Sequence, residues 1–161
     1  MSTLDLVELD QLQANYIQAL DSKNMEAWLA RFSSDPAASY VCTTRENVRK
    51  ELPLALMLDD CHARIRDRVT FVTKIWAGTF QDYQTRHLTQ RLSARRLDDG
   101  MIRVNSALAV YYTLDETGIS QLLATGEYED LIKTEQSELR FLSKKVVLDT
   151  SVLPRYLVFP L

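Results

Sequence analysis

Cysteine, histidine, glycine and proline are all scarce in this 161-residue chain, with two, two, four and four copies respectively. Two cysteines, Cys42 and Cys61, cannot build the disulfide framework of a small secreted domain. So few glycines and prolines argue against long flexible linkers. No apolar stretch approaches the roughly 20 residues that span a membrane, and residues 1–10 show no cationic segment followed by an apolar run. We therefore expect a cytoplasmic protein with neither a signal peptide nor a membrane contact.

The same shortage limits metal and cofactor chemistry. A Rieske cluster needs two cysteines and two histidines, and a mononuclear iron site of the facial-triad type needs two more histidines. Two residues of each type in total cannot supply both sites. Residues 59–62 (DDCH) resemble a metal cluster on paper, but four adjacent residues that open a helix cannot all face one ion. We therefore predict that the chain is not a self-sufficient iron oxygenase and that it holds no metal or cofactor of its own.

Charge and motifs exclude further classes. The net charge of −3 and the pI of about 5.4 leave no basic footprint for nucleic acid. Gly-rich phosphate loops, Gly-x-Ser-x-Gly elbows and Cys-x-x-Cys pairs are missing from the sequence. The length and the 46% hydrophobic content suit one domain with a full core.

Apolar spacing separates a helical first part from a strand-rich second part. Three- and four-residue spacing of apolar residues predicts helices over 4–20, 22–32 and 61–75. Between the second and third of these helices, the sequence favours short strands over 38–44 and 52–58. We expect Ser2 or Thr3 to cap the first helix and Asp59 or Asp60 to cap the third.

From Thr85 onward the apolar period changes to two. In a strand over 86–97, Leu88, Leu92 and Ala94 are expected on the apolar face, which places His87 on the polar face unless a bulge reverses it. Turns at 98–100, 116–118 and 135–137 then separate further long antiparallel strands. This order predicts an α+β fold over residues 1–161, with N-terminal helices packed on one side of a curved antiparallel sheet.

The final stretch, 144–161, is unusually apolar for a chain end. Its first part, 144–149, alternates like a last strand, whereas Pro154 and Pro160 disfavour a continued strand after it. We expect 152–161 to run along the surface towards another chain. The candidate subunit contacts are His87, Arg155, Tyr156, Phe159 and Leu161.

Several short blocks occur in an order that is typical of one family. They are YIQALDSKNMEAWLARF (16–32), REN (45–47) with LPL (52–54) and DD (59–60), DRV (67–69), RHL (86–88), and VVLD (146–149) with LP (153–154). Together these blocks resemble the small (β) subunit of bacterial aromatic-ring-hydroxylating oxygenases. The short segment between Ile75 and Arg86 is similar in style to members that act on single-ring aromatic acids such as benzoate, anthranilate or salicylate.

The resemblance implies a cone-shaped fold of the nuclear transport factor-like (cystatin-like) type. It also implies a large α subunit as partner, commonly in an α3β3 hexamer. That partner would carry the [2Fe-2S] Rieske cluster and the non-haem Fe(II), and it would receive electrons from a ferredoxin, a reductase or both. On this view the chain is a non-catalytic structural β subunit of a mono- or dioxygenase.

A second hypothesis stays open beside it. A stand-alone isomerase, dehydratase or hydrolase of the same fold would use Asp21, Tyr16 and His87 as an acid–base group in the cone. Such an enzyme needs a carboxylate and its partner to converge in one cavity.

Overall fold

The computed structural model describes residues 4–161, in which short helices precede four long strands. The helices are α1 (Leu6–Asp21), α2 (Met25–Leu29), α3 (Arg45–Arg49), α4 (His62–Thr70) and the π-helical turn η1 (Phe71–Ile75). The strands are β1 (Ser39–Thr44), β2 (Met57–Asp59), β3 (Tyr83–Arg96), β4 (Ile102–Leu114), β5 (Ser120–Glu135) and β6 (Glu138–Leu148). The predicted α+β class is confirmed.

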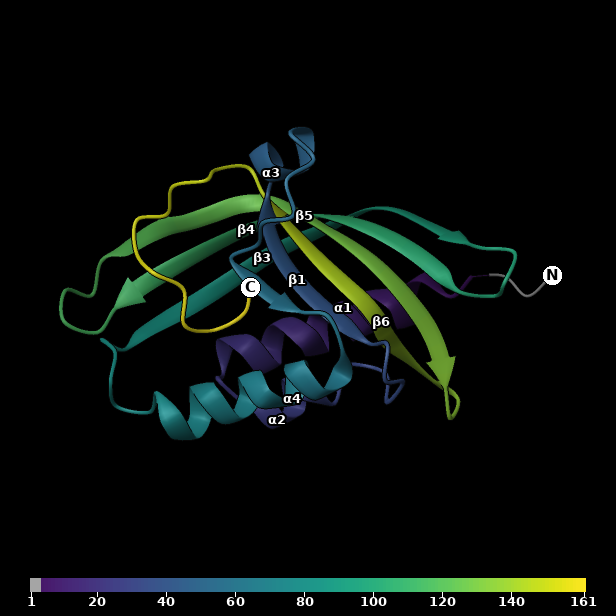
Figure 1. The fold of residues 1–161 in the computed structure, drawn as a ribbon, viewed down its shortest axis with the longest axis horizontal. Helices are drawn as coiled ribbons and strands as arrows, with labels where there is room; N and C mark the ends of the chain where they lie inside the picture. The colour runs from purple at the N-terminus through teal and green to yellow at the C-terminus, as the bar shows by residue number, and fades with distance from the viewer. Residues whose placement is uncertain (1–3) are drawn as a thin grey trace.

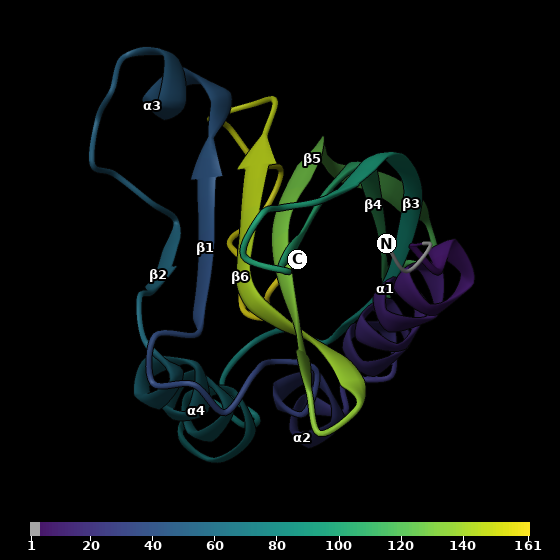
Figure 2. The ribbon, with the colours of Figure 1, turned by 90° about the vertical axis from the view of Figure 1, so that its right-hand side faces the viewer.

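All six strands form one sheet in the order β2-β1-β6-β5-β4-β3. Hairpins connect β3 to β6 in an antiparallel run, and β6 then pairs parallel with β1. A register shift interrupts each of the β3–β4, β4–β5 and β5–β6 pairs. Such irregularities bend strands, and the sheet arches over the helices (Figure 1). Helices α1, α2 and α4 lie on the concave side of the sheet, whereas α3 lies beyond the end of β1 (Figure 2).

Aromatic side chains fill the space between the sheet and the helices. Tyr16, Trp28 and Phe141 are fully buried there, and the rings of Trp28 and Phe32 meet edge to face at 5.0 Å. Strands β5 and β6 approach very closely at Gly126, where a Cβ atom would lie 2.3 Å from the carbonyl oxygen of Val147. The interior of the cone is therefore closely packed with side chains around these rings.

Two helix starts differ from the sequence prediction. Asp5 caps α1, because its carboxylate accepts hydrogen bonds from the backbone of Val7 and Glu8 at 3.0 and 3.1 Å. The predicted caps Ser2 and Thr3 lie outside the described residues. Helix α4 starts after Cys61 without a side-chain cap, since Asp59 instead forms a buried ion pair with Arg68.

The predicted facing of β3 was wrong. Leu88 and Leu92 are more than half exposed on the outer side, whereas Thr85 and His87 point inward and are buried. A bulge between Arg91 and Ser93 lets Ala94 return to the inner side, so the three apolar residues do not share one face. The hydroxyl of Thr85 and Nδ1 of His87 both pair with the carboxylate of Asp21 in the interior, which offsets part of the cost of burying them.

Strand β2 is much shorter than predicted. Only Met57–Asp59 pairs with β1, in an antiparallel ladder at the edge of the sheet. Pro53 has no N–H to donate, and the residues before Met57 form an extended loop instead. In the described part of the chain, no helix is long and apolar enough to span a lipid bilayer.

Candidate functional site

The structure brings Asp21 and His87 together, as the acid–base hypothesis requires. Asp21 ends α1, and its Oδ1 lies 2.6 Å from Nδ1 of His87 on β3. The same carboxylate accepts hydrogen bonds from the hydroxyl of Thr85 at 2.9 Å and from the backbone N–H of His87 at 3.2 Å. Three donors therefore fix the carboxylate, which in turn fastens the C-terminal end of α1 to β3.

The other ring nitrogen of His87 decides what this pair can do. Nε2 is buried and contacts no polar group among residues 4–161. A groove of about 400 Å³ runs past Asp21 and His87 between α1 and β3, and apolar surface dominates its lining. Because Nε2 is shielded, a molecule in this groove does not reach the atom that would act as a base. The third candidate, Tyr16, points elsewhere.

Tyr16 holds the end of the chain. Its hydroxyl donates to the carbonyl of Leu161 at 2.8 Å, and the hydroxyl of Tyr40 accepts from the N–H of Leu161 at 2.9 Å. Leu161 is 2% exposed and Phe159 is 8% exposed, with the ring of Phe159 edge-on to Phe80. The prediction that the tail runs along the surface towards another chain was therefore wrong for residues 158–161. These residues are buried in the cone of their own chain.

The physical reason lies in the two hydroxyls. A buried tyrosine needs a polar partner, and the backbone of Leu161 supplies one to Tyr16 and Tyr40 together. Phe159, Leu161 and His87 thus expose almost no surface to another chain in this conformation. Tyr156 is 59% exposed, and its role as a subunit contact stays a prediction.

Arg155 is partly buried, intermediate in exposure between Tyr156 and the buried end of the tail. Its guanidinium stacks on the ring of Tyr83 at 3.7 Å and donates to the carbonyl of Gln81 at 3.2 Å. Its Nε and Nη1 are buried without a partner among the described residues. This stacking contact fastens the tail to β3 and directs the residues after Arg155 towards the core.

A buried ion pair that the sequence analysis missed lies at the centre of the cone. Nζ of Lys144 on β6 is 3.0 and 2.9 Å from the two carboxylate oxygens of Asp130 on β5, and it also donates to Gln13 on α1 at 2.9 Å. The ammonium lies 3.9 Å from the centre of the Tyr128 ring. Burial lowers the pKa of Lys144 to about 8 and raises the pKa of Asp130.

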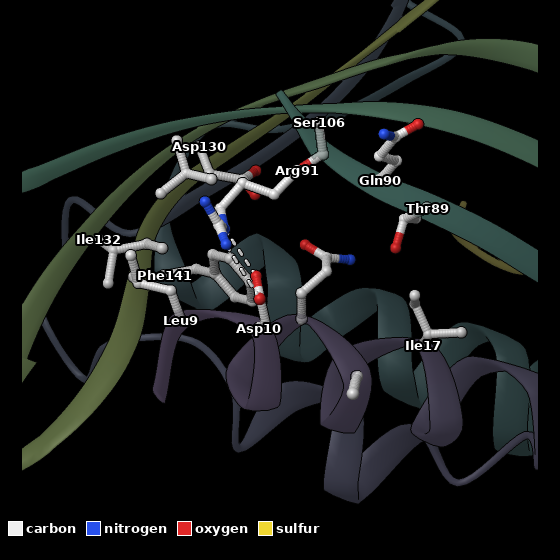
Figure 3. Close-up of a pocket in the computed structure, with 13 residues that line it drawn as sticks. Leu9, Asp10, Ile17, Thr89, Gln90, Arg91, Ser106, Asp130, Ile132 and Phe141 are labelled. Carbon is white, nitrogen blue, oxygen red and sulfur yellow. Dashed lines mark hydrogen bonds and ion pairs between the residues drawn. The ribbon is translucent and has the colours of Figure 1, made fainter. Parts of the chain in front are cut away.

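A cavity of about 430 Å³ lies above this pair, between α1 and the sheet. Asp10 and Arg91 form a two-pronged ion pair across it, at 2.7 and 3.1 Å (Figure 3). The rest of its lining mixes apolar and polar side chains, which include those of Ile17, Phe141 and Ser106. It is separate from the filled part of the cone that the tail occupies.

Metal-binding groups do not gather in the structure. Residues 4–161 contain no group of three or more His, Cys, Asp or Glu side chains placed to hold an ion. Cys42 is buried, which raises the pKa of its thiol to about 12 and disfavours the thiolate that metals bind. The residues present do not fit an iron–sulfur cluster or a mononuclear iron.

Comparison with known proteins identifies the family. The family model described as "Ring hydroxylating beta subunit" matches residues 16–155. The anthranilate 1,2-dioxygenase small subunit of Burkholderia cepacia is 30% identical over 154 residues, which cover 96% of this chain and 92% of the relative. The chain belongs to the ring-hydroxylating β-subunit family.

Solved structures give the same result for the fold of this β subunit. A Novosphingobium aromaticivorans structure, described as the β subunit of an aromatic-ring-hydroxylating dioxygenase, matches with a TM-score of 0.81 and 25% identity over 95% of this chain and 94% of that one. A cystatin-like protein from Nostoc punctiforme matches with a TM-score of 0.63 and 18% identity over 96% and 97%. The predicted family and its cystatin-like fold are both confirmed. As a β subunit of this family, the chain is one part of an oxidoreductase complex that also contains a larger subunit.

This β subunit also exposes an apolar segment at the edge of its sheet. From the last turn of α3 into β2, residues 48–58 form what we call the apolar arm. Large aliphatic side chains project from it into solvent at Val48, Leu52, Leu54, Leu56 and Leu58. The hydroxyl of Thr43 donates to the carbonyl of Leu54 at 2.7 Å, and the N–H of Leu56 donates to the carbonyl of Cys42 at 2.7 Å. The arm is therefore held in place against β1 (Figure 2).

Proposed function

We propose that this chain is the non-catalytic, structural β subunit of a Rieske oxygenase, and that it acts as a single domain in the cytoplasm. The large α subunit carries the [2Fe-2S] cluster and the non-haem Fe(II), and receives electrons from a ferredoxin, a reductase or both. Three copies of each subunit form the α3β3 assembly. The anthranilate relative supports a single-ring aromatic acid as the substrate of the complex. The β subunit supplies a rigid sheet that orders the α subunits.

The observation that carries this proposal is the family match over residues 16–155 combined with the burial of the tail in the cone of its own chain. The tail residues Phe159 and Leu161 are buried there against the core. The buried Asp130 and Lys144 neutralise each other. No step of the hydroxylation is assigned to a residue of this chain.

The Asp21–His87 pair is the observation that favours a second candidate, a stand-alone acid–base enzyme. The carboxylate orients the imidazole as it does in many hydrolases. The burial of Nε2 counts against this function, because a general base must come within hydrogen-bond reach of the proton that it removes. We instead assign the pair a positioning role, in which it fastens α1 to β3.

We further propose that the apolar arm contacts the α subunit. Single chains rarely expose contiguous apolar patches larger than a few hundred Å², and the arm shows five large aliphatic side chains in eleven residues. Its backbone hydrogen bonds to β1 hold it in one conformation, which lowers the entropy that binding would otherwise cost. Tyr156 and Arg155 remain candidate contacts on the tail.

Co-expression with the gene of the large subunit tests the proposed function. We expect the two chains to elute together, with iron and Rieske-type absorbance confined to fractions that contain the large subunit. The β subunit expressed alone should bind less than about one-tenth of an equivalent of iron. Stoichiometric iron in the isolated chain, or separate elution of the two subunits, would contradict the proposal. Loss of an isomerase or dehydratase activity on His87→Ala would favour the second candidate.

A further inference from the structure

The cavity between α1 and the sheet combines features of a small-molecule binding site. Its volume of about 430 Å³ falls within the roughly 300–1,000 Å³ of typical ligand pockets. The lining combines apolar side chains, of Leu9, Ile17 and Phe141, with polar ones, of Thr89 and Ser106. In Figure 3 the hydroxyl of Thr89 points from β3 towards α1, with Ile17 opposite on the helix.

An unused hydrogen-bond donor lies in the same lining. The carbonyl oxygen of the Gln13 side chain accepts from Lys144, which orients the amide and leaves Nε2 as its donor group. Nε2 is buried and has no partner among residues 4–161. Burial shields this atom from the cavity as it shields Nε2 of His87, so a ligand in the cavity meets the hydroxyls of Thr89 and Ser106 instead. Gln13, Thr89 and Ser106 converge on the cavity from α1, β3 and β4.

The charges around the cavity select against ions. Asp130 borders the cavity, but Lys144 compensates its carboxylate from behind. Asp10 and Arg91 compensate each other at the mouth. An anion would therefore lie beside the buried Asp130 carboxylate without a free cation, and a cation would have no free carboxylate. A neutral molecule avoids the cost of burying an uncompensated charge, whether positive or negative.

We propose that this cavity binds a neutral, single-ring molecule that carries a hydroxyl or carbonyl group. The ring packs against Leu9 and Phe141, and the oxygen contacts the hydroxyls of Thr89 and Ser106. The Asp10–Arg91 pair closes the mouth over the ligand. This binding site is independent of the proposed assembly with an α subunit, since it uses neither the arm nor the tail.

Titration of the full-length β subunit with benzyl alcohol, followed by backbone NMR shifts and calorimetry, tests the proposal. We expect saturable one-to-one binding with shifts centred on Gln13, Ser106 and Ile132. Toluene lacks the oxygen and benzoate carries a charge, so each should bind at least tenfold more weakly. Benzoate binding as tight as that of benzyl alcohol would overturn the neutral class, and shifts centred on the arm or the outer sheet face would overturn the site.

Two variants with matched controls keep the test independent of folding defects. Ala14→Trp places a large ring at the exposed rim of the cavity and should abolish binding, whereas Ala63→Trp at an exposed position of α4 should leave it unchanged. Ser106→Ala should weaken binding about tenfold, whereas Ser93→Ala on the outer side of β3 should not. Unchanged affinity in Ala14→Trp, or no saturable binding to the unmodified chain, would refute the proposal.

Discussion

At the scale of single residues, the buried Lys144–Asp130 pair is the most consequential feature of the interior. Both side chains are almost wholly inaccessible to solvent, and removing one partner of such a pair leaves an uncompensated buried charge. We predict that Lys144→Met lowers the free energy of unfolding by about 3–5 kcal/mol. The double variant Lys144→Met/Asp130→Leu should recover most of the loss, as measured by urea unfolding.

The pH dependence of the single variant follows from Asp130. Burial raises the pKa of its carboxyl above the ordinary value of 3.8, while Lys144 lowers it, so loss of the lysine raises that pKa further. A carboxyl whose pKa is higher in the folded state stabilises the fold fully below its unfolded pKa, and this stability is lost as the pH rises through the folded pKa. Lys144→Met should therefore approach the double variant in stability near pH 3–4 and fall behind it towards neutral pH. A constant difference would contradict the account.

The sequence already contained a signal for Lys144. In the strand alternation it shares a face with Val146 and Leu148, which are buried as that pattern predicts. Its partner could not be read from the chain, because the register of β5 against β6 contains a bulge and fixes the Asp130–Lys144 pairing only in three dimensions. The same limit applied to His87, whose inward facing is supported by a carboxylate 66 residues away in the chain.

At the scale of elements, periodicity predicted the helices and the long hairpins well but not how the tail packs. The helix-then-strand order and all three turns of the long strands were predicted from local patterns. The tail is apolar whether it faces its own core or another chain, so composition could not decide between them. The hydroxyls of Tyr16 and Tyr40 hold the tail inside by bonding to the backbone of Leu161, and they lie more than 120 residues earlier in the chain.

The inward course of the tail makes a definite prediction. Deletion of Val158–Leu161 removes three buried apolar side chains, each of which stabilises the fold by about 1.5–3 kcal/mol, and leaves the hydroxyl of Tyr16 without its partner. We expect the free energy of unfolding to fall by at least about 4 kcal/mol, as followed by the fluorescence of the buried Trp28. Val152→Ala, at an exposed position of the same tail, should change it by less than about 0.5 kcal/mol. An unfolding midpoint that does not move on deletion would refute the claim that residues 158–161 stabilise the core of their own chain.

At the scale of the whole molecule, assembly with a partner depends on the surface of this β subunit. Two of the exposed apolar groups lie on the sheet. One is the apolar arm, and the other includes Leu88, Tyr111 and Leu122 on the open face of β3, β4 and β5. The arm is contiguous in the chain and projects at the edge of the sheet, whereas residues of the open face alternate with charged neighbours such as Arg86.

We therefore predict that Leu54→Asp/Leu56→Asp weakens association with the large subunit at least tenfold, because each aspartate would have to be desolvated in an apolar contact. Both leucines are exposed in the free chain, so the melting temperature of the isolated β subunit should change by less than about 2 °C. Co-elution with the large subunit and a melting curve of the isolated chain provide the two measurements. Val7→Asp/Val152→Asp, at exposed positions outside the arm, is the matched control and should assemble normally. If Leu88→Asp/Leu122→Asp on the open face abolished assembly while the arm variant retained it, the contact with the large subunit would belong to the open face and not to the arm.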